Sequence, residues 1–256
     1  MSEFLYRRNV VLETLRAGRR DLRRLLLADD ADQDAVRDAL AEAKRRNLKI
    51  ERRPRKDLNI ISHGDNHQGL AVEVGPYPYA DFDAALDRAN ALGELPLLLL
   101  LDQVQDPANV GRLLRTAEAC GVHGVYLPDK GSGEITPAVV TASMGASEHM
   151  LVTRVGNMAR TMELFKKSDI WLAGLDLSPR AQTLGQVDLN RPLGIVVGNE
   201  GDGIRRLVRE KCDFLLRLPM RGHVQSLNAA VAGSIVLYAA WQARGFSGQK
   251  TDGSRQ

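Results

Sequence analysis

Residues 194–207 read GIVVGNEGDGIRRL, an apolar run followed by three glycines within six positions and then by a helix-like start. This order is typical of a strand, loop and helix in an α/β fold. The loop matches neither the dinucleotide fingerprint nor the P-loop, and Glu200 in its middle would repel a pyrophosphate. The loop therefore suits a neutral or cationic ligand, although the loop alone is also compatible with a simple tight turn.

The chain on both sides of this loop alternates apolar runs with helical patterns from residue 96 to residue 246. Continuous apolar strands separated by helices predict an α/β domain with a mainly parallel sheet that is covered on both faces. Residues 1–76 form a smaller α/β pattern, with strands expected at 22–28, 48–53 and 67–75 and helices at 9–18 and 33–47. Residues 77–95 fit a linker, and residues 247–256 are expected to be a disordered tail.

Several function classes are disfavoured by composition. No apolar run approaches the roughly 20 residues that cross a bilayer, and the first residues lack the apolar segment of a signal peptide. A cytoplasmic protein without a membrane partner is expected. Cys120 and Cys212 are expected to be buried thiols, and His63 and His67 are expected to be structural, so we predict no metal site.

Positive charge is concentrated near the N-terminus. Residues 1–60 contain 16 Lys and Arg against 11 Asp and Glu, whereas the remainder contains 19 against 21. The basic residues form three clusters: Arg19, Arg20, Arg23 and Arg24; Lys44, Arg45 and Arg46; and Arg52, Arg53, Arg55 and Lys56. Such clusters indicate either a solvated helix face or a surface that contacts RNA phosphates.

Two further stretches place polar residues after apolar runs, where an α/β sheet binds its ligands. In DQVQDPANVGRLLRTAEACG (102–121), Asn109, Arg112 and Arg115 are spaced to lie on one helix face. In LPMRGHVQSLNAAVAG (218–233), Ser226 and Asn228 precede the final helix. The first stretch is also compatible with a helix cap at Asn109 and surface ion pairs of the arginines, and the second with an N-cap at Ser226 or Asn228.

Taken together, the segments NVGRLLRTAEACG, IVVGNEGDGI, VREKCDFLLRLPM and VQSLNAAVA resemble the motifs of the TrmH/SpoU family of RNA 2′-O-ribose methyltransferases, in the SPOUT superfamily. The N-terminal unit, including HQGLAVEV (67–74), resembles the ribosomal-protein-like substrate-binding domain of the RlmB-like branch, which methylates a guanosine in large-subunit 23S rRNA.

The resemblance implies a deep trefoil knot in a SPOUT methyltransferase domain (96–246), bound S-adenosylmethionine and a homodimer. The residues implied in cofactor binding are Gly198, Glu200, Gly201, Leu218, Met220, Leu227 and Asn228. The residues implied in catalysis are Asn109, Arg115, Glu200, Ser226 and Asn228. The family assigns Arg115 the activation of the hydroxyl, but a guanidinium stays protonated at neutral pH because its pKa is about 12.5 to 13.8. We therefore favour a charge role in which Arg115 and Arg112 hold the target phosphate.

RNA is the expected partner, and DNA is excluded because it lacks the 2′-hydroxyl. The residues expected to contact RNA are Arg112, Arg19, Arg20, Arg23, Arg24, Arg52 and Arg53. The same chemistry on tRNA or another rRNA position remains an alternative, as does an RNA-binding ribosome-assembly factor without catalysis. A nucleotide-dependent oxidoreductase ranks far below, because the first strand of the larger domain lacks the dinucleotide fingerprint.

Overall fold

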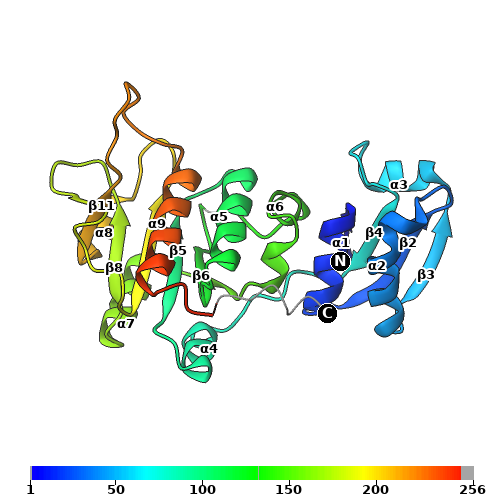
Figure 1. Ribbon diagram of the computed structural model, residues 1–256, viewed down its shortest axis with the longest axis horizontal. Helices are drawn as coiled ribbons and strands as arrows, with labels where there is room; N and C mark the ends of the chain where they lie inside the picture. The colour runs from blue at the N-terminus through cyan, green and yellow to red at the C-terminus, as the bar shows by residue number, and fades with distance from the viewer. Residues whose placement is uncertain (1, 132, 249–256) are drawn as a thin grey trace. The chain divides into compact units, whose positions relative to one another are not determined.

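The structure is a computed structural model that describes residues 2–131 and 133–248 (Figure 1). Most of the tail for which disorder was predicted, residues 249–256, lies outside the described residues. The chain divides into two compact units. The first comprises Met1–Pro78 and Glu134–Met150, and the second comprises Tyr79–Gly133 and Leu151–Gln256.

A four-stranded sheet in the order β1-β4-β2-β3 forms the centre of the first unit. Strand β3 runs parallel to β2, whereas β4 is antiparallel to both β1 and β2. The elements are β1 (Glu3–Tyr6), α1 (Arg8–Ala17), β2 (Leu22–Ala28), α2 (Gln33–Arg45), β3 (Lys49–Arg53), α3 (Arg55–Ile61) and β4 (Leu70–Val74). The three strands and two helices predicted here are present, whereas β1 and α3 were not predicted.

The segment Glu134–Met150 belongs to the first unit, although the sequence placed it inside the larger domain. It contains α6 (Pro137–Ala142) and a short 3-10 helix, η1 (Ala146–His149). The hydroxyl of Tyr77 donates to the carbonyl of Ser147, 2.9 Å away, and His149 lies 2.9 Å from Glu13 on α1. These tertiary contacts join residues more than 65 positions apart, so a local pattern could not reveal them.

Arg20 is part of this attachment, and its expected contact with RNA is wrong. Its side chain is fully buried, and its Nε lies 2.9 Å from Glu148 Oε2 while its Nη1 lies 2.7 Å from Glu3. Arg19 also points inward and donates to backbone carbonyls, including that of Pro78 at 3.2 Å. A buried guanidinium that compensates a buried carboxylate is unavailable to a phosphate.

The second unit is built on a seven-stranded sheet in the order β7-β6-β5-β10-β8-β11-β9, and every strand pair in it is parallel. Its strands are β5 (Leu97–Asp102), β6 (Gly124–Pro128), β7 (Val152–Val155), β8 (Trp171–Leu175), β9 (Gln182–Thr183), β10 (Leu193–Gly198) and β11 (Phe214–Arg217). The strand β10 was predicted from the opening stretch, and it inserts between β5 and β8. The two-residue strand β9 was not predicted.

Helices cover both faces of this sheet, as predicted. The helices are α4 (Ala84–Leu92), α5 (Pro107–Ala119), α7 (Met158–Lys167), α8 (Arg206–Lys211) and α9 (Ala229–Ala243). On one face, Leu100 and Val196 share a buried cluster with Phe165 of α7 and Val208 of α8. Helices α5 and α9 contact each other and lie side by side in Figure 1, and α9 also contacts β10. Among the described helices, none is both long and apolar enough to span a bilayer.

A glycine brings α9 close to its neighbours. A Cβ atom on Gly233 would lie 2.6 Å from Leu113 of α5 and 3.0 Å from Val197 of β10. A larger residue would push the helix outward, because a packed interior has no room for an added methyl group. Gly233 thus holds the helix that follows Asn228 against the strand that precedes Glu200.

The buried Arg20 gives a stability prediction for the first unit. We expect Arg20→Ala to lower the free energy of unfolding by about 3 to 5 kcal/mol, because it leaves Glu148 buried without its partner. We expect the control Arg23→Ala, in which the side chain is 40% exposed, to stay within about 0.5 kcal/mol. Urea denaturation measures both, and equal losses would contradict a structural role for Arg20.

Candidate functional site

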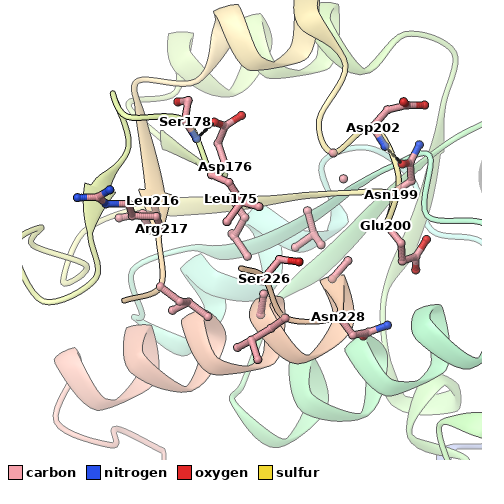
Figure 2. A pocket seen from close by; sticks show the side chains of 18 of the residues that line it. Leu175, Asp176, Ser178, Asn199, Glu200, Asp202, Leu216, Arg217, Ser226 and Asn228 are labelled. Carbon is pink, nitrogen blue, oxygen red and sulfur yellow. Dashed lines mark hydrogen bonds between the residues drawn. The ribbon is translucent and has the colours of Figure 1, made fainter. Parts of the chain in front are cut away.

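A cavity of about 530 Å³ lies in the second unit, where β8, β10 and β11 end (Figure 2). Four segments contribute most of its wall: residues 175–178, 197–203, 216–220 and 226–232. The carboxyl ends of parallel strands are the usual ligand-binding edge of an open α/β sheet. The volume of the cavity is within the range of small-molecule sites, roughly 300 to 1,000 Å³.

The glycine-rich loop folds back on the strand that precedes it. Asn199 Oδ1 accepts hydrogen bonds from the backbone amides of Gly201 and Asp202, at 2.9 and 2.7 Å. Asn199 also forms an isolated bridge with Gly203, whose φ of +68° favours glycine. A Cβ atom on Gly198 would lie 2.1 Å from the carbonyl carbon of Gly203, so only glycine permits this close return.

An ion pair between an exposed arginine and a buried carboxylate fixes the end of the same loop. Asp102, the last residue of β5, is fully buried, and its Oδ1 accepts from Arg205 Nε at 2.8 Å. Its Oδ2 accepts from the backbone amide of Arg205 at 2.9 Å. Both carboxylate oxygens of Asp102 therefore hold the residue that begins the turn into α8.

Three polar residues from distant segments meet beside the cavity. Asn109, which is buried in the first turns of α5, donates through Nδ2 to Glu200 Oε1. Its Oδ1 accepts from Asn228 Nδ2 at 3.2 Å and from Arg112 at 3.1 Å. Asn228 also caps α9, because its Oδ1 accepts from the backbone amides of Ala230 and Val231. Asn228 is therefore both the N-cap of α9 and a member of this polar contact. The N-cap of α5 is Asp106 and not Asn109.

The residues expected to bind the cofactor line one cavity. They are Gly198, Glu200, Gly201, Leu218, Met220, Leu227 and Asn228, and Ser226 lines the cavity with them. Asn109 reaches the cavity only through Glu200 and Asn228, and it is not part of the wall. Arg112 and Arg115 are exposed on α5 and do not line the cavity.

Sequence reasoning missed a second polar group in the wall, which comprises Asp176, Ser178 and Arg209. Asp176 Oδ1 accepts from the backbone amide of Ser178 at 2.7 Å, and Oδ2 lies 3.6 Å from Arg209 Nη1. Burial acts to raise the pKa of Asp176, but the polar groups of Ser178 and the charge of Arg209 outweigh it and leave the pKa below its usual value. Its position directly after the apolar run 171–175 was an available signal, because ligands gather at strand ends.

The wall combines exposed carboxylates with apolar side chains. Glu200 and Asp202 carry negative charge into the loop, whereas Leu218, Met220 and Leu227 are apolar. The arrangement suits an organic ligand with an apolar ring and a positive centre, and it disfavours a pyrophosphate by charge repulsion.

Within residues 2–131 and 133–248, no three His, Cys, Asp or Glu side chains gather in a way that could hold a metal ion. His67 is buried, and its Nε2 lies 3.0 Å from Asn59 Oδ1. Both cysteines are free, and burial raises the pKa of the Cys120 thiol to about 11 and that of Cys212 to about 12.

Comparison with known proteins gives two family matches. Residues 96–238 match the SpoU rRNA methylase family, and residues 4–80 match the RNA 2′-O ribose methyltransferase substrate-binding family. A Bacillus subtilis protein named as a TrmH family tRNA/rRNA methyltransferase, YacO, is 40% identical over 94% of this chain and 96% of its own length. A Synechocystis protein named as a tRNA/rRNA methyltransferase, slr0955, is 37% identical over 95% of this chain and 63% of its own.

Solved structures share the fold over nearly the whole chain. The SpoU methyltransferase AviRb from Streptomyces viridochromogenes, in complex with AdoMet, matches with a TM-score of 0.78 and 23% identity, covering 96% of this chain and 92% of AviRb. A Porphyromonas gingivalis protein described as belonging to the TrmH family matches with a TM-score of 0.73 and 28% identity, covering 95% and 90%.

The close return of the loop onto Gly198 can be tested by adding one methyl group. We expect Gly198→Ala to lower the free energy of unfolding by about 1 to 3 kcal/mol, because its Cβ overlaps the backbone of Gly203. Amide hydrogen exchange at Gly201 and Asp202 should accelerate in the same variant. Gly222→Ala is the matched control, because its Cβ would meet no atom within 4 Å. Unchanged exchange in Gly198→Ala would refute the packed loop.

Proposed function

The chain belongs to the SpoU rRNA methylase family, and we propose that it methylates a ribose 2′-hydroxyl in RNA, with a guanosine of large-subunit rRNA as the favoured target. The observation that carries this proposal is the junction of Asn109, Glu200 and Asn228 beside a cavity at the ends of the strands. The three residues come from the three segments that resemble the family motifs.

S-adenosylmethionine is the methyl donor in this proposal, and the cavity wall fits it. Its sulfonium is cationic, which suits Glu200, and its adenine is apolar, which suits Leu218, Met220 and Leu227. Structures similar in fold have been solved with AdoMet, including AviRb and an rRNA methyltransferase from Sinorhizobium meliloti. The deep trefoil knot expected from the resemblance remains part of this proposal.

The transfer requires one bond to break and one to form. When bound, the donor would supply a methyl group whose bond to sulfur breaks as its bond to the ribose oxygen forms, and the hydroxyl proton would pass to the target phosphate or to water. Asn109 positions the loop that carries Glu200, and Ser226 at the cavity wall lies where a ribose could be oriented. In this proposal Arg112 and Arg115, which are exposed on α5, hold the target phosphate and stabilise the developing negative charge.

The RNA surface of the first unit lies around β3 and α3 in this proposal. Arg52 and Lys56 are exposed, and within the described residues neither makes an ion pair. By contrast, Arg23, Arg24 and Arg53 are each paired with a carboxylate, which reduces their net attraction for phosphate. We therefore expect Arg52 and Lys56 to contribute more to RNA binding than the paired arginines do.

A homodimer is also part of the proposal. Val231, Ile235 and Tyr238 lie three to four residues apart on α9 and are 44, 39 and 52% exposed. Val236, on the same helix, is buried in the core instead. Three exposed apolar residues on one helix face support a surface that a second copy covers.

The same chemistry on tRNA is the second candidate, because the curated relatives carry names that include tRNA as well as rRNA. A TrmH/SpoU tRNA modifying enzyme from Aquifex aeolicus matches 64% of this chain with a TM-score of 0.55 and 27% identity.

Methyl transfer from labelled S-adenosylmethionine tests the proposal. We expect label in undermethylated large-subunit rRNA, at a single ribose 2′-oxygen that nuclease mapping identifies. Bulk tRNA is tested in parallel. Label found only in tRNA would support the methyl transfer but would identify tRNA, and not rRNA, as the substrate. Absence of label in both RNAs, with the donor bound, would instead favour an RNA-binding assembly factor.

The same assay tests the charge role proposed for Arg115. If Arg115 holds phosphate and stabilises charge, Arg115→Gln should lower kcat by about 10²- to 10³-fold, as does removal of a comparable charge-stabilising donor. Arg115→Lys keeps the charge but loses the planar fork, so it should recover part of the rate. Full activity in Arg115→Gln would exclude the charge role.

Binding to rRNA fragments at several salt concentrations tests the β3–α3 surface. We expect the double variant Arg52→Ala/Lys56→Ala to reduce the slope of log affinity against log salt by about one for each lost phosphate contact. Arg45→Ala is the matched control, because Arg45 is exposed but already paired with Glu42 at 2.6 Å. An unchanged slope in the double variant would place the RNA elsewhere.

A further inference from the structure

The polar group formed by Asp176, Ser178 and Arg209 lies apart from the junction of Asn109, Glu200 and Asn228. In Figure 2, Asp176 and Ser178 lie to the left in the cavity, and Glu200 lies to the right. The cavity therefore offers a second place where a ligand's polar groups could be bound, away from the residues to which the methyl transfer is assigned.

Asp176 is held as a hydrogen-bond acceptor that faces this cavity. Its side chain is only 12% exposed, and the backbone amide of Ser178 occupies Oδ1 at 2.7 Å. Its backbone amide donates to the carbonyl of Leu216, so its position is also fixed by β11. Among the described residues, no hydrogen bond reaches Oδ2, whose nearest cation is Arg209 at 3.6 Å.

The Ser178 hydroxyl is a second polar atom without a partner at this place. It is buried, and it makes no hydrogen bond of ordinary geometry within the described part of the chain, although it lies near the Asp176 carboxylate and lowers the pKa of that group. A buried hydroxyl that lacks a partner costs about 1 to 3 kcal/mol in general, and a bound ligand can remove that cost. Asp176 Oδ2 and the Ser178 hydroxyl can therefore each bond one polar group of a ligand.

We infer that Asp176 binds the ribose hydroxyls of the methyl donor's adenosine, with Asp176 Oδ2 accepting from one hydroxyl and the Ser178 hydroxyl bonding to the other. This inference rests on the proposed function. An acidic residue that bonds a ribose diol near a strand end is a recurrent arrangement in α/β nucleotide sites. The donor's ammonium group fits less well, because Arg209 already places a positive charge beside Asp176 Oδ2.

Calorimetric binding of two ligands to the full chain tests this assignment. S-adenosylhomocysteine carries both ribose hydroxyls, and its 2′,3′-dideoxy analogue carries neither. We expect Asp176→Ala to weaken the binding of S-adenosylhomocysteine by about 10- to 100-fold, and Asp176→Asn to weaken it by less. The dideoxy analogue should bind the wild type and both variants with affinities that agree within about twofold.

Asp188→Asn is the matched control, because Asp188 has the same local arrangement outside the cavity. Its Oδ1 accepts from the backbone amide of Asn190 at 2.8 Å, and its Oδ2 pairs with Arg191 at 3.1 Å. We expect this variant to bind both ligands as the wild type does. Thermal unfolding of each variant establishes that the fold is retained, and Asp176→Asn carries the test if Asp176→Ala unfolds.

The outcomes separate this inference from the proposed function. Equal losses for both ligands in the Asp176 variants would overturn the ribose assignment, since Asp176 would then act on the loop or on the ammonium group. A wild type that binds neither ligand would overturn the proposed donor and the assignment of Asp176 with it. Losses confined to S-adenosylhomocysteine would support the assignment.

Discussion

The buried carboxylate of Asp102 is the constraint on which the cavity depends. It ends β5 without solvent exposure, and Arg205 supplies hydrogen bonds to both of its oxygens. A buried charge without such a partner would cost several kcal/mol, so the chain must return to this point after the glycine-rich loop. That return sets the length of the loop, forces the close approach at Gly198, and presents Glu200 to Asn109.

The parallel sheet was predictable because its central strands are buried on both faces and therefore appear as continuous apolar runs. The opening stretch gave β10 directly, but its place between β5 and β8 depends on pairings with residues about 20 and 100 positions away. Strands β1 and β9 have four and two residues, too few to show a period. Only tertiary contacts join Glu134–Met150 to the first unit.

The candidate site was predictable to the extent that family motifs mark it, since the residues expected to bind the cofactor all line one cavity. Physical patterning alone gave only polar residues after apolar runs. The basic clusters show where sequence patterning fails, because a count of charges does not reveal which arginines form ion pairs with carboxylates. Strand register places Arg24 opposite Glu73, and Arg24 also contacts Glu51, so a residue that looked free for RNA is neutralised within the sheet.

Helix α9 connects the cavity to the surface proposed for self-association. Its first turns carry Ala229 and Ala232 into the cavity wall, and its cap Asn228 bonds Asn109. On the neighbouring faces of the same turns, Gly233 packs against α5 and β10, while Val231 and Ile235 remain exposed. A second copy that covers the exposed face would press the helix onto the strand that leads into the glycine-rich loop. Association and order in the cavity would then stabilise each other, because both act on the same rigid helix.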